Sequence, residues 1–123
     1  MFSKLFSKPA DPQVEWHQLN NLSQLAEIEE RSKERPVLIF KHSTRCSISA
    51  MALGKFERNF DSEAKFDPYF LDLIAHREVS NEIASRYHVV HESPQALLIV
   101  DGKVIYHASH NGINFQEINN QVQ

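Results

Sequence analysis

The side chain that offers the clearest chemistry is the thiol of Cys46, because it is the single cysteine of the chain. A lone cysteine cannot form a disulfide within the chain, and it cannot build a multi-cysteine zinc or iron–sulfur site. Three residues later the chain has Ser49, so it shows C-S-I-S where dithiol proteins show C-x-x-C. Since a hydroxyl forms no disulfide, a mixed disulfide on Cys46 has to be resolved by a second, separate thiol.

The sequence places Cys46 where a buried strand is followed by a helix. Residues 37–40 form a continuous apolar run, and an amphipathic helical pattern extends from about 46 to 60. The first turn of a helix has free backbone N–H groups and the positive end of the helix dipole. Both favour the thiolate over the thiol, so this position predicts a reactive cysteine.

Four side chains near Cys46 are candidates for supporting its thiolate. Thr44 and Arg45 directly precede it, and a cation beside the sulfur favours the charged form. Ser49 lies one helical turn later, so its hydroxyl can approach the sulfur. His42, four residues earlier, would act in the same direction when protonated. The alternative is that Cys46 is a small buried hydrophobe and inert, which a position at a helix start argues against.

A second motif is Ser93-Pro94, directly before the apolar run 96–100. Proline is tolerated at the first residue of a strand. His91 and His110 flank the expected site, and we consider them candidates for orienting the thiol. The histidine pairs of the chain have no carboxylate cluster that would complete a tetrahedral set, so we expect no metal site.

The hydrophobic pattern predicts the order β-α-β-α-β-α-β-β-α. Strands are expected near 14–19, 37–40, 68–74, 96–100 and 104–107, and helices near 20–34, 46–60, 79–87 and from Gly112 onward. The alternation implies parallel neighbours joined by right-handed crossovers. Asp101-Gly102 predicts a tight turn, which makes the last two strands an antiparallel hairpin. The expected fold is therefore α/β, with a mixed central sheet flanked by helices in three layers.

Two of these helices show an apolar stripe that we expect to face the core. The stripe of the helix over 20–34 consists of Leu22, Leu25 and Ile28. The stripe of the helix over 46–60 consists of Ile48, Met51, Ala52, Phe56 and Phe60. Both stripes recur at three- and four-residue steps, which is the period of an amphipathic helix.

The length of 123 residues indicates one compact domain. We expect residues 1–13 to be a flexible tail and residues 14–123 to be the domain. Thirteen Lys and Arg against 16 Asp and Glu give a net charge of −3, which provides no basic surface for nucleic acid or an anionic membrane. No apolar run approaches the roughly 20 residues of a membrane span. With a single cysteine and no secretory signal, we expect a cytoplasmic monomer.

The order of these features resembles the thioredoxin fold, from residue 14 to the end of the chain. That fold combines a strand, a helix begun by a reactive cysteine, a further β-α unit, a proline that opens a strand, a hairpin and a last helix. In that superfamily the proline is cis and lies beside the active-site cysteine, and the residue before it offers backbone hydrogen bonds to the bound disulfide partner. The resemblance implies that Pro94 is cis and that Ser93 and Pro94 bind the substrate.

Three motifs carry a closer resemblance. The pattern K-H-S-T-x-C-x-I-S is found at residues 41–49, H-E-S-P-Q at residues 91–95 and H-x-S-H-x-x-I at residues 107–113. In these motifs the chain resembles the YtxJ family of bacillithiol-system proteins, which are monothiol bacilliredoxins. The resemblance implies that Cys46 removes bacillithiol from protein mixed disulfides. It also implies bacillithiol as the exchanging small thiol, S-bacillithiolated proteins as partners and no bound cofactor.

The chain departs from the family pattern at Ser47, where family members often have proline. Ser47 keeps a backbone N–H in the first helical turn, which alters the stabilisation of the thiolate. The strand over 37–40 also lacks the buried carboxylate that thioredoxins use during dithiol resolution.

Two alternatives stay open. One is a glutathione-dependent monothiol glutaredoxin, although that family usually shows C-G-F-S, and the other is a noncatalytic thioredoxin-like binding module with an unreactive Cys46.

Overall fold

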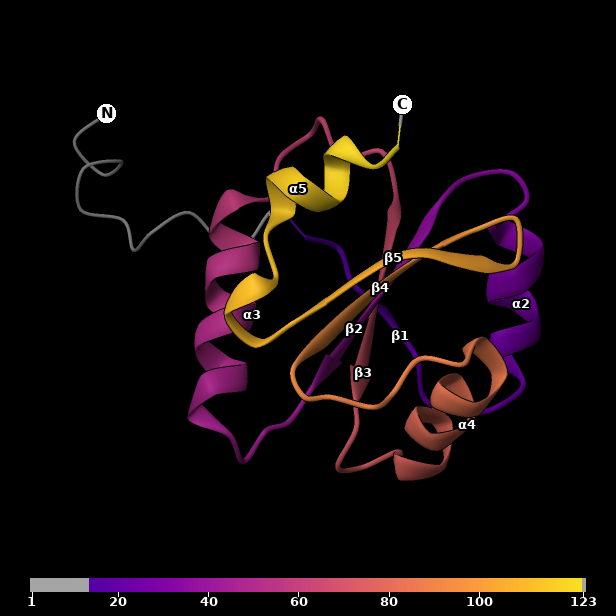
Figure 1. Cartoon of the computed structure of the whole chain (residues 1–123), viewed down its shortest axis with the longest axis horizontal. Coiled ribbons are helices and arrows are strands. Elements are labelled where there is room, and N and C mark those ends of the chain that lie inside the picture. Colours follow the sequence, from indigo (N-terminus) through magenta and orange to yellow (C-terminus); the bar gives the residue numbers. More distant parts are fainter. Residues whose placement is uncertain (1–13, 123) are drawn as a thin grey trace.

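The computed structural model describes residues 14–122 (Figure 1). The tail expected over residues 1–13 lies outside this range. The strands are β1 (His17–Gln18), β2 (Val37–His42), β3 (Asp67–Asp72), β4 (Gln95–Val100) and β5 (Lys103–Ser109). The helices are α2 (Gln24–Arg31), α3 (Ser47–Asn59), α4 (Arg77–Tyr87), the 3-10 turn η1 (His110–Gly112) and α5 (Phe115–Asn120). The predicted order of elements is confirmed.

The five strands form one mixed sheet in the order β1-β3-β2-β4-β5. β3 pairs in parallel with β1 and with β2, whereas β4 pairs antiparallel with β2 and with β5. The turn between β4 and β5 has positive φ at both Asp101 (51°) and Gly102 (75°). Positive φ at both central residues is the geometry of the type I′ hairpin turn, which confirms the hairpin expected from Asp-Gly.

Helices cover both faces of the sheet, which gives the expected three layers (Figure 1). One face carries an aliphatic core that includes Leu25 and Ile28 of α2 and Val79 and Ile83 of α4. The other face carries an aromatic core below α3 and α5. Its rings include Phe40, Phe56, Phe60, Phe66 and Phe115, and their centroids lie 5.3–6.4 Å apart in the contacting pairs. Alternation along β2 divides its side chains between these two cores.

The expected apolar stripes are wrong at three residues. Ile48 and Met51 of α3 are 52% and 73% exposed, and Leu22, before α2, is 48% exposed. The strip of α3 that packs on the sheet instead contains Ser49, Ala52 and Phe56. Ile48 and Met51 each directly precede a member of this strip, so each is turned about 100° around the helix from the residue that follows it. Two apolar side chains of α3 therefore lie on the surface within its first two turns.

The expectation that Gly112 opens the last helix is also wrong. Gly112 ends η1, and α5 begins only at Phe115. The start of α5 is set by Asn114, whose side-chain oxygen accepts a hydrogen bond of 2.9 Å from the N–H of Glu117. This is the N-cap arrangement that satisfies a free donor of the first turn. Within residues 14–122, none of these helices is long and apolar enough to cross a membrane.

Candidate active site

The three sequence motifs meet at one edge of the sheet. β2 and β4 are antiparallel neighbours with Lys41 opposite Gln95, so the end of β2 lies beside the start of β4. The backbone N–H of His110 donates to the carbonyl of Pro94 over 3.0 Å, which fixes η1 at the same edge. Segments that are about fifty residues apart in the sequence are thus brought around the start of α3.

Cys46 is the N-cap residue of α3, with φ −121° and ψ 121°, and it is half-buried. Its N–H donates to the carbonyl of Ser43 over 3.3 Å, and its own carbonyl accepts from Ala50 over 3.1 Å. A side chain at an N-cap normally accepts hydrogen bonds from the first-turn N–H groups, although the Cys46 side chain makes no such bond with the described residues. Those donors and the positive end of the helix dipole favour negative charge on a sulfur at this position.

Ser49 is completely buried and connects the Cys46 loop to β2. Its hydroxyl oxygen accepts from the N–H of Ser43 over 3.0 Å and lies 2.8 Å from Nδ1 of His42. Burial lowers the pKa of His42, so its ring is neutral at pH 7 and Nδ1 shares a hydrogen bond with the Ser49 hydroxyl. A neutral His42 brings no positive charge to this loop, and the hydrogen bonds of Ser49 join the loop to β2. Support of the Cys46 thiolate by Ser49 stays a prediction.

Thr44 and Arg45 are exposed residues in the loop before α3. Arg45 takes part in no salt bridge with another described residue. Both residues stand on the solvent side of the loop. Their support of the thiolate stays a prediction.

The Ser93–Pro94 peptide bond is cis, as the resemblance implies. Pro94 is buried at the start of β4 and Ser93 is half-buried before it. The hydroxyl oxygen of Ser93 is inaccessible and has no hydrogen-bond partner among residues 14–122. His110 is exposed and adopts a positive φ of 54° where β5 passes into η1. The roles of these residues in substrate binding stay predictions.

Comparison with known proteins identifies the family. Residues 17–118 match the family model described as monothiol bacilliredoxin BrxC. The chain belongs to the monothiol bacilliredoxin family. A solved structure described as a candidate oxidoreductase with a thioredoxin fold is similar at 35% identity, with a TM-score of 0.72 over 82% of this chain and 88% of that one.

Thioredoxins share the fold of this bacilliredoxin at much lower identity. The thioredoxin of Malassezia sympodialis has a TM-score of 0.67 at 15% identity over 90% of each chain. The thioredoxin of Fasciola hepatica has a TM-score of 0.67 at 17% identity, over 85% of this chain and 94% of its own. These likenesses confirm the thioredoxin-like fold.

The bacilliredoxin also contains a buried lysine that sequence reasoning missed. β2 continues past Phe40, and the Lys41 side chain on it is 0% exposed. Its Nζ lies 3.3 Å from Nδ1 of His91 and 3.5 Å from the carbonyl oxygen of Ser80. Burial lowers the pKa of Lys41 to about 8. The alternation of a strand could have revealed it, because residues 37, 39 and 41 share one face.

Lys41 and Gln95 hold the segment that leads to Pro94. The pKa of His91 is lowered by burial and by the charges of Lys41 and Arg77, so its ring is neutral and Nδ1 accepts a hydrogen bond from the Lys41 ammonium. Nε2 of Gln95 donates to the carbonyl of Val90 over 3.0 Å. Two buried side chains of neighbouring strands thus fix residues 90 and 91. His91 touches this cluster, and its predicted effect on the thiol would act through the segment.

The seven histidines do not build a metal centre in the part of the chain that is described. Residues 14–122 contain no group of three or more His, Cys, Asp or Glu side chains placed to hold a metal ion. The chemistry supported by this edge of the sheet is that of the Cys46 thiol.

Proposed function

We propose that this bacilliredoxin reduces mixed disulfides between bacillithiol and proteins through Cys46. The observation that carries the proposal is the position of the single cysteine at the N-cap of α3, at the edge where the three family motifs meet. The family match supports bacillithiol as the small thiol. The absence of a second cysteine means that a further small thiol completes the cycle.

The cycle has two exchange steps. In the first, the Cys46 thiolate attacks the bacillithiol sulfur, the protein–bacillithiol disulfide breaks, and the protein leaves as a thiolate that takes a proton from solvent. In the second, the thiolate of free bacillithiol attacks the bacillithiol sulfur on Cys46. This step releases the Cys46 thiolate and gives bacillithiol disulfide. The net reaction converts the mixed disulfide and one free bacillithiol into the protein thiol and bacillithiol disulfide, so one disulfide bond is broken and one is formed.

The residues around Cys46 have three further roles: stabilising the thiolate, contacting the substrate and supporting the loop. The first-turn N–H groups of α3 stabilise the thiolate both as attacking and as leaving group. Thr44 and Arg45 meet the substrate from the solvent side, while Ser93 and Pro94 present the opposite wall. Ser49 and His42 keep the loop in shape. One chain contains all of these groups, so we propose that the monomer is the active form.

Intact-mass measurement of wild type and Cys46→Ser tests the proposal. Each protein is incubated with a bacillithiol-modified and, separately, a glutathione-modified reporter protein. We expect a bacillithiol adduct on wild type alone, and its release by added bacillithiol. An adduct from the glutathione reporter only would assign the chain to glutaredoxin-type chemistry. Failure of both reporters to modify Cys46 would favour a noncatalytic binding module.

A further inference from the structure

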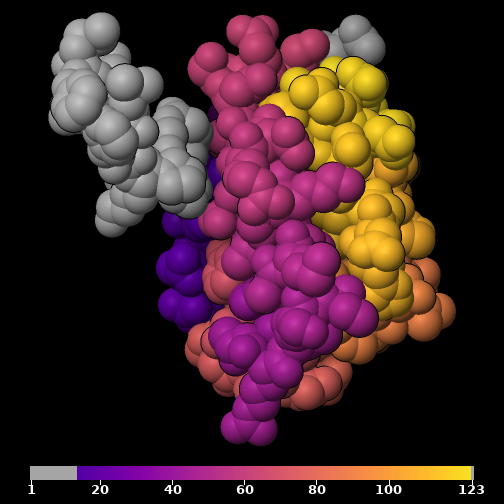
Figure 2. Space-filling view, turned by 90° about the vertical axis from the view of Figure 1, so that its left-hand side faces the viewer, coloured from indigo at the N-terminus to yellow at the C-terminus, as the bar shows by residue number. Residues whose placement is uncertain are grey.

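A groove of about 380 Å³ runs between α3 and η1. In Figure 2 the surfaces of these two segments lie directly side by side. The lining includes apolar side chains, among them the exposed Met51 and the buried Ile113. The volume is in the range of small-molecule sites, which combine apolar walls with a few polar groups.

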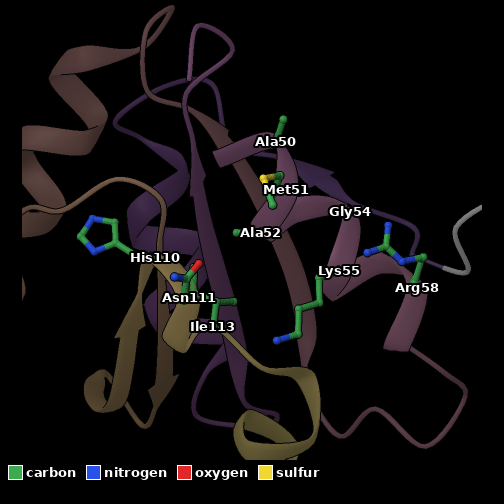
Figure 3. A pocket seen from close by; sticks show the side chains of 9 residues that line it. All are labelled: Ala50, Met51, Ala52, Gly54, Lys55, Arg58, His110, Asn111 and Ile113. Atoms are coloured by element: carbon green, nitrogen blue, oxygen red, sulfur yellow. The ribbon is translucent and has the colours of Figure 1, made fainter. Parts of the chain in front are cut away.

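Two cations, Lys55 and Arg58, line the α3 side of this groove. Neither forms a salt bridge with any residue of the described range 14–122, and the groove lining contains no Asp or Glu. Figure 3 shows the Lys55 side chain reaching from α3 toward the segment with Asn111 and Ile113. The groove therefore presents uncompensated positive charge in a protein whose net charge is −3.

The groove begins one helical turn after Cys46, which does not itself line it. Ala50 lines it, and its N–H donates to the carbonyl of Cys46. On the other wall His110 lines it, and its N–H donates to the carbonyl of Pro94. Lys55 lies nine residues after Cys46, roughly 13 Å along the helix axis at 1.5 Å per residue. The Lys55 side chain itself extends across the groove toward Ile113 (Figure 3).

Arg58 has room to lie along the groove because of Gly54. A Cβ at position 54 would stand 3.1 Å from Nη1 of Arg58, a tighter approach than ordinary van der Waals contact. The guanidinium thus folds back over the glycine, one turn nearer to Cys46 than its own Cα. The two cations are three residues apart on α3, with Lys55 extending toward Ile113 and Arg58 folded back toward Gly54 (Figure 3), so each can meet a different negative group of one ligand.

We propose that this groove binds the carboxylate-bearing part of the small thiol while its sulfur is at Cys46, with Lys55 and Arg58 as the groups that bind the carboxylates. This inference rests on the proposed function. Bacillithiol carries its two carboxylates on a malyl group away from the thiol, and glutathione also has two carboxylates. The shared chemistry is a dicarboxylate small thiol, and we assign bacillithiol as the occupant.

The test uses the double variant Lys55→Gln/Arg58→Gln of the full chain. The second-order rate of adduct formation on Cys46 is measured by mass with three disulfides, namely bacillithiol disulfide, glutathione disulfide and the uncharged bis(2-hydroxyethyl) disulfide. We expect the double variant to lose roughly tenfold with bacillithiol disulfide, since each exposed ion pair contributes up to about a fivefold factor. The rate with the uncharged disulfide should change less than twofold. Added salt should slow the wild type with bacillithiol disulfide more than it slows the variant.

Lys103→Gln is the matched control, because Lys103 is an exposed lysine paired with Val100 at the far end of β4. It should leave all three rates unchanged. If the double variant lost rate equally with charged and uncharged disulfides, or lost none, the proposal that the groove binds the carboxylates would be wrong. The proposed function would still stand. A selective loss with glutathione disulfide alone would overturn bacillithiol as occupant. A wild type that reacts with the uncharged disulfide but never with bacillithiol disulfide would overturn the proposed function and this inference together.

Discussion

Two buried polar clusters lie on opposite faces of the sheet at the end of β2. On the α3 face, His42, Ser49 and the N–H of Ser43 are joined by hydrogen bonds of 2.8 and 3.0 Å, and the histidine is neutral at pH 7. On the α4 face, Lys41 lies 3.3 Å from His91 and 3.5 Å from the carbonyl of Ser80. The first cluster is neutral and has short hydrogen bonds, whereas the second contains a charged ammonium whose hydrogen bonds are longer.

The difference follows from what each cluster has to hold. The cluster on the α3 face fixes the loop that carries Cys46, and neutral groups with short hydrogen bonds do this at little desolvation cost. The cluster on the α4 face fixes the segment before Pro94 with an ammonium that has no acidic partner among the salt bridges of residues 14–122. Burial without a counter-charge is expensive. We therefore expect the two clusters to have opposite effects on the free energy of unfolding.

The largest expected effect is that of Lys41→Met. The pKa of Lys41 falls from 10.5 to about 8 on folding, which corresponds to a penalty of about 3 kcal/mol for the protonated form. Methionine fills the same space without a charge, so the variant should unfold at higher urea concentration at pH 7. It should also lose the bond to His91, and amide hydrogen exchange at Glu92 and Ser93 should become faster.

The pH dependence sharpens this prediction. Between pH 8 and about 10.4 the unfolded chain keeps the proton of Lys41 and the folded chain loses it. The free energy of unfolding of the wild type should therefore rise with pH across this window, and that of Lys41→Met should not show this rise. Lys103→Met, at an exposed lysine, should keep the rise. A parallel pH slope in wild type and Lys41→Met would contradict the buried-ammonium interpretation.

The next effect concerns the cluster on the α3 face. Ser49→Ala leaves Nδ1 of His42 and the N–H of Ser43 without their partner in a buried site. Unsatisfied buried groups cost about 1–3 kcal/mol each, so urea denaturation should show a loss of this order. Ser47→Ala, at an exposed neighbour on the same turn, should change stability by less than about 0.5 kcal/mol. Equal losses in the two variants would show that the cluster does not brace the loop.

The smallest effect is expected on the acid side. Burial lowers the pKa of both His42 and His91. Below about pH 6.5 each of these histidines binds a proton more readily in the unfolded chain than in the folded chain. The free energy of unfolding should therefore fall as the pH is lowered. His42→Asn should weaken this fall, because asparagine can still accept from Ser49 and carries no charge. His107→Asn, at an exposed histidine, is the control and should leave the acid dependence unchanged.

The order of the elements could be predicted from local patterns, because helices, buried strands and tight turns each leave a distinct pattern of apolar and turn-forming residues in the sequence. The apolar runs predicted β2 and β4, and Asp101-Gly102 predicted the turn between β4 and β5. The lone cysteine and its distance of three residues from Ser49 predicted monothiol chemistry. The details of α3 could not be predicted, because Ile48 and Ser49 both lie at helical spacing from Ala52, and packing decides which of the two faces the sheet.

By itself, the sequence determined the kind of chemistry and the family, since both depend on which residues follow one another along the chain. Tertiary structure alone decided which side chains share an environment. It buried Lys41 against His91, fifty residues away, and turned the Ser49 hydroxyl to His42. It also placed Lys55 and Arg58 along a groove that Ala50, four residues after Cys46, lines as well. Burial lowers or raises a pKa only where several elements pack together, and no local sequence pattern contains that information.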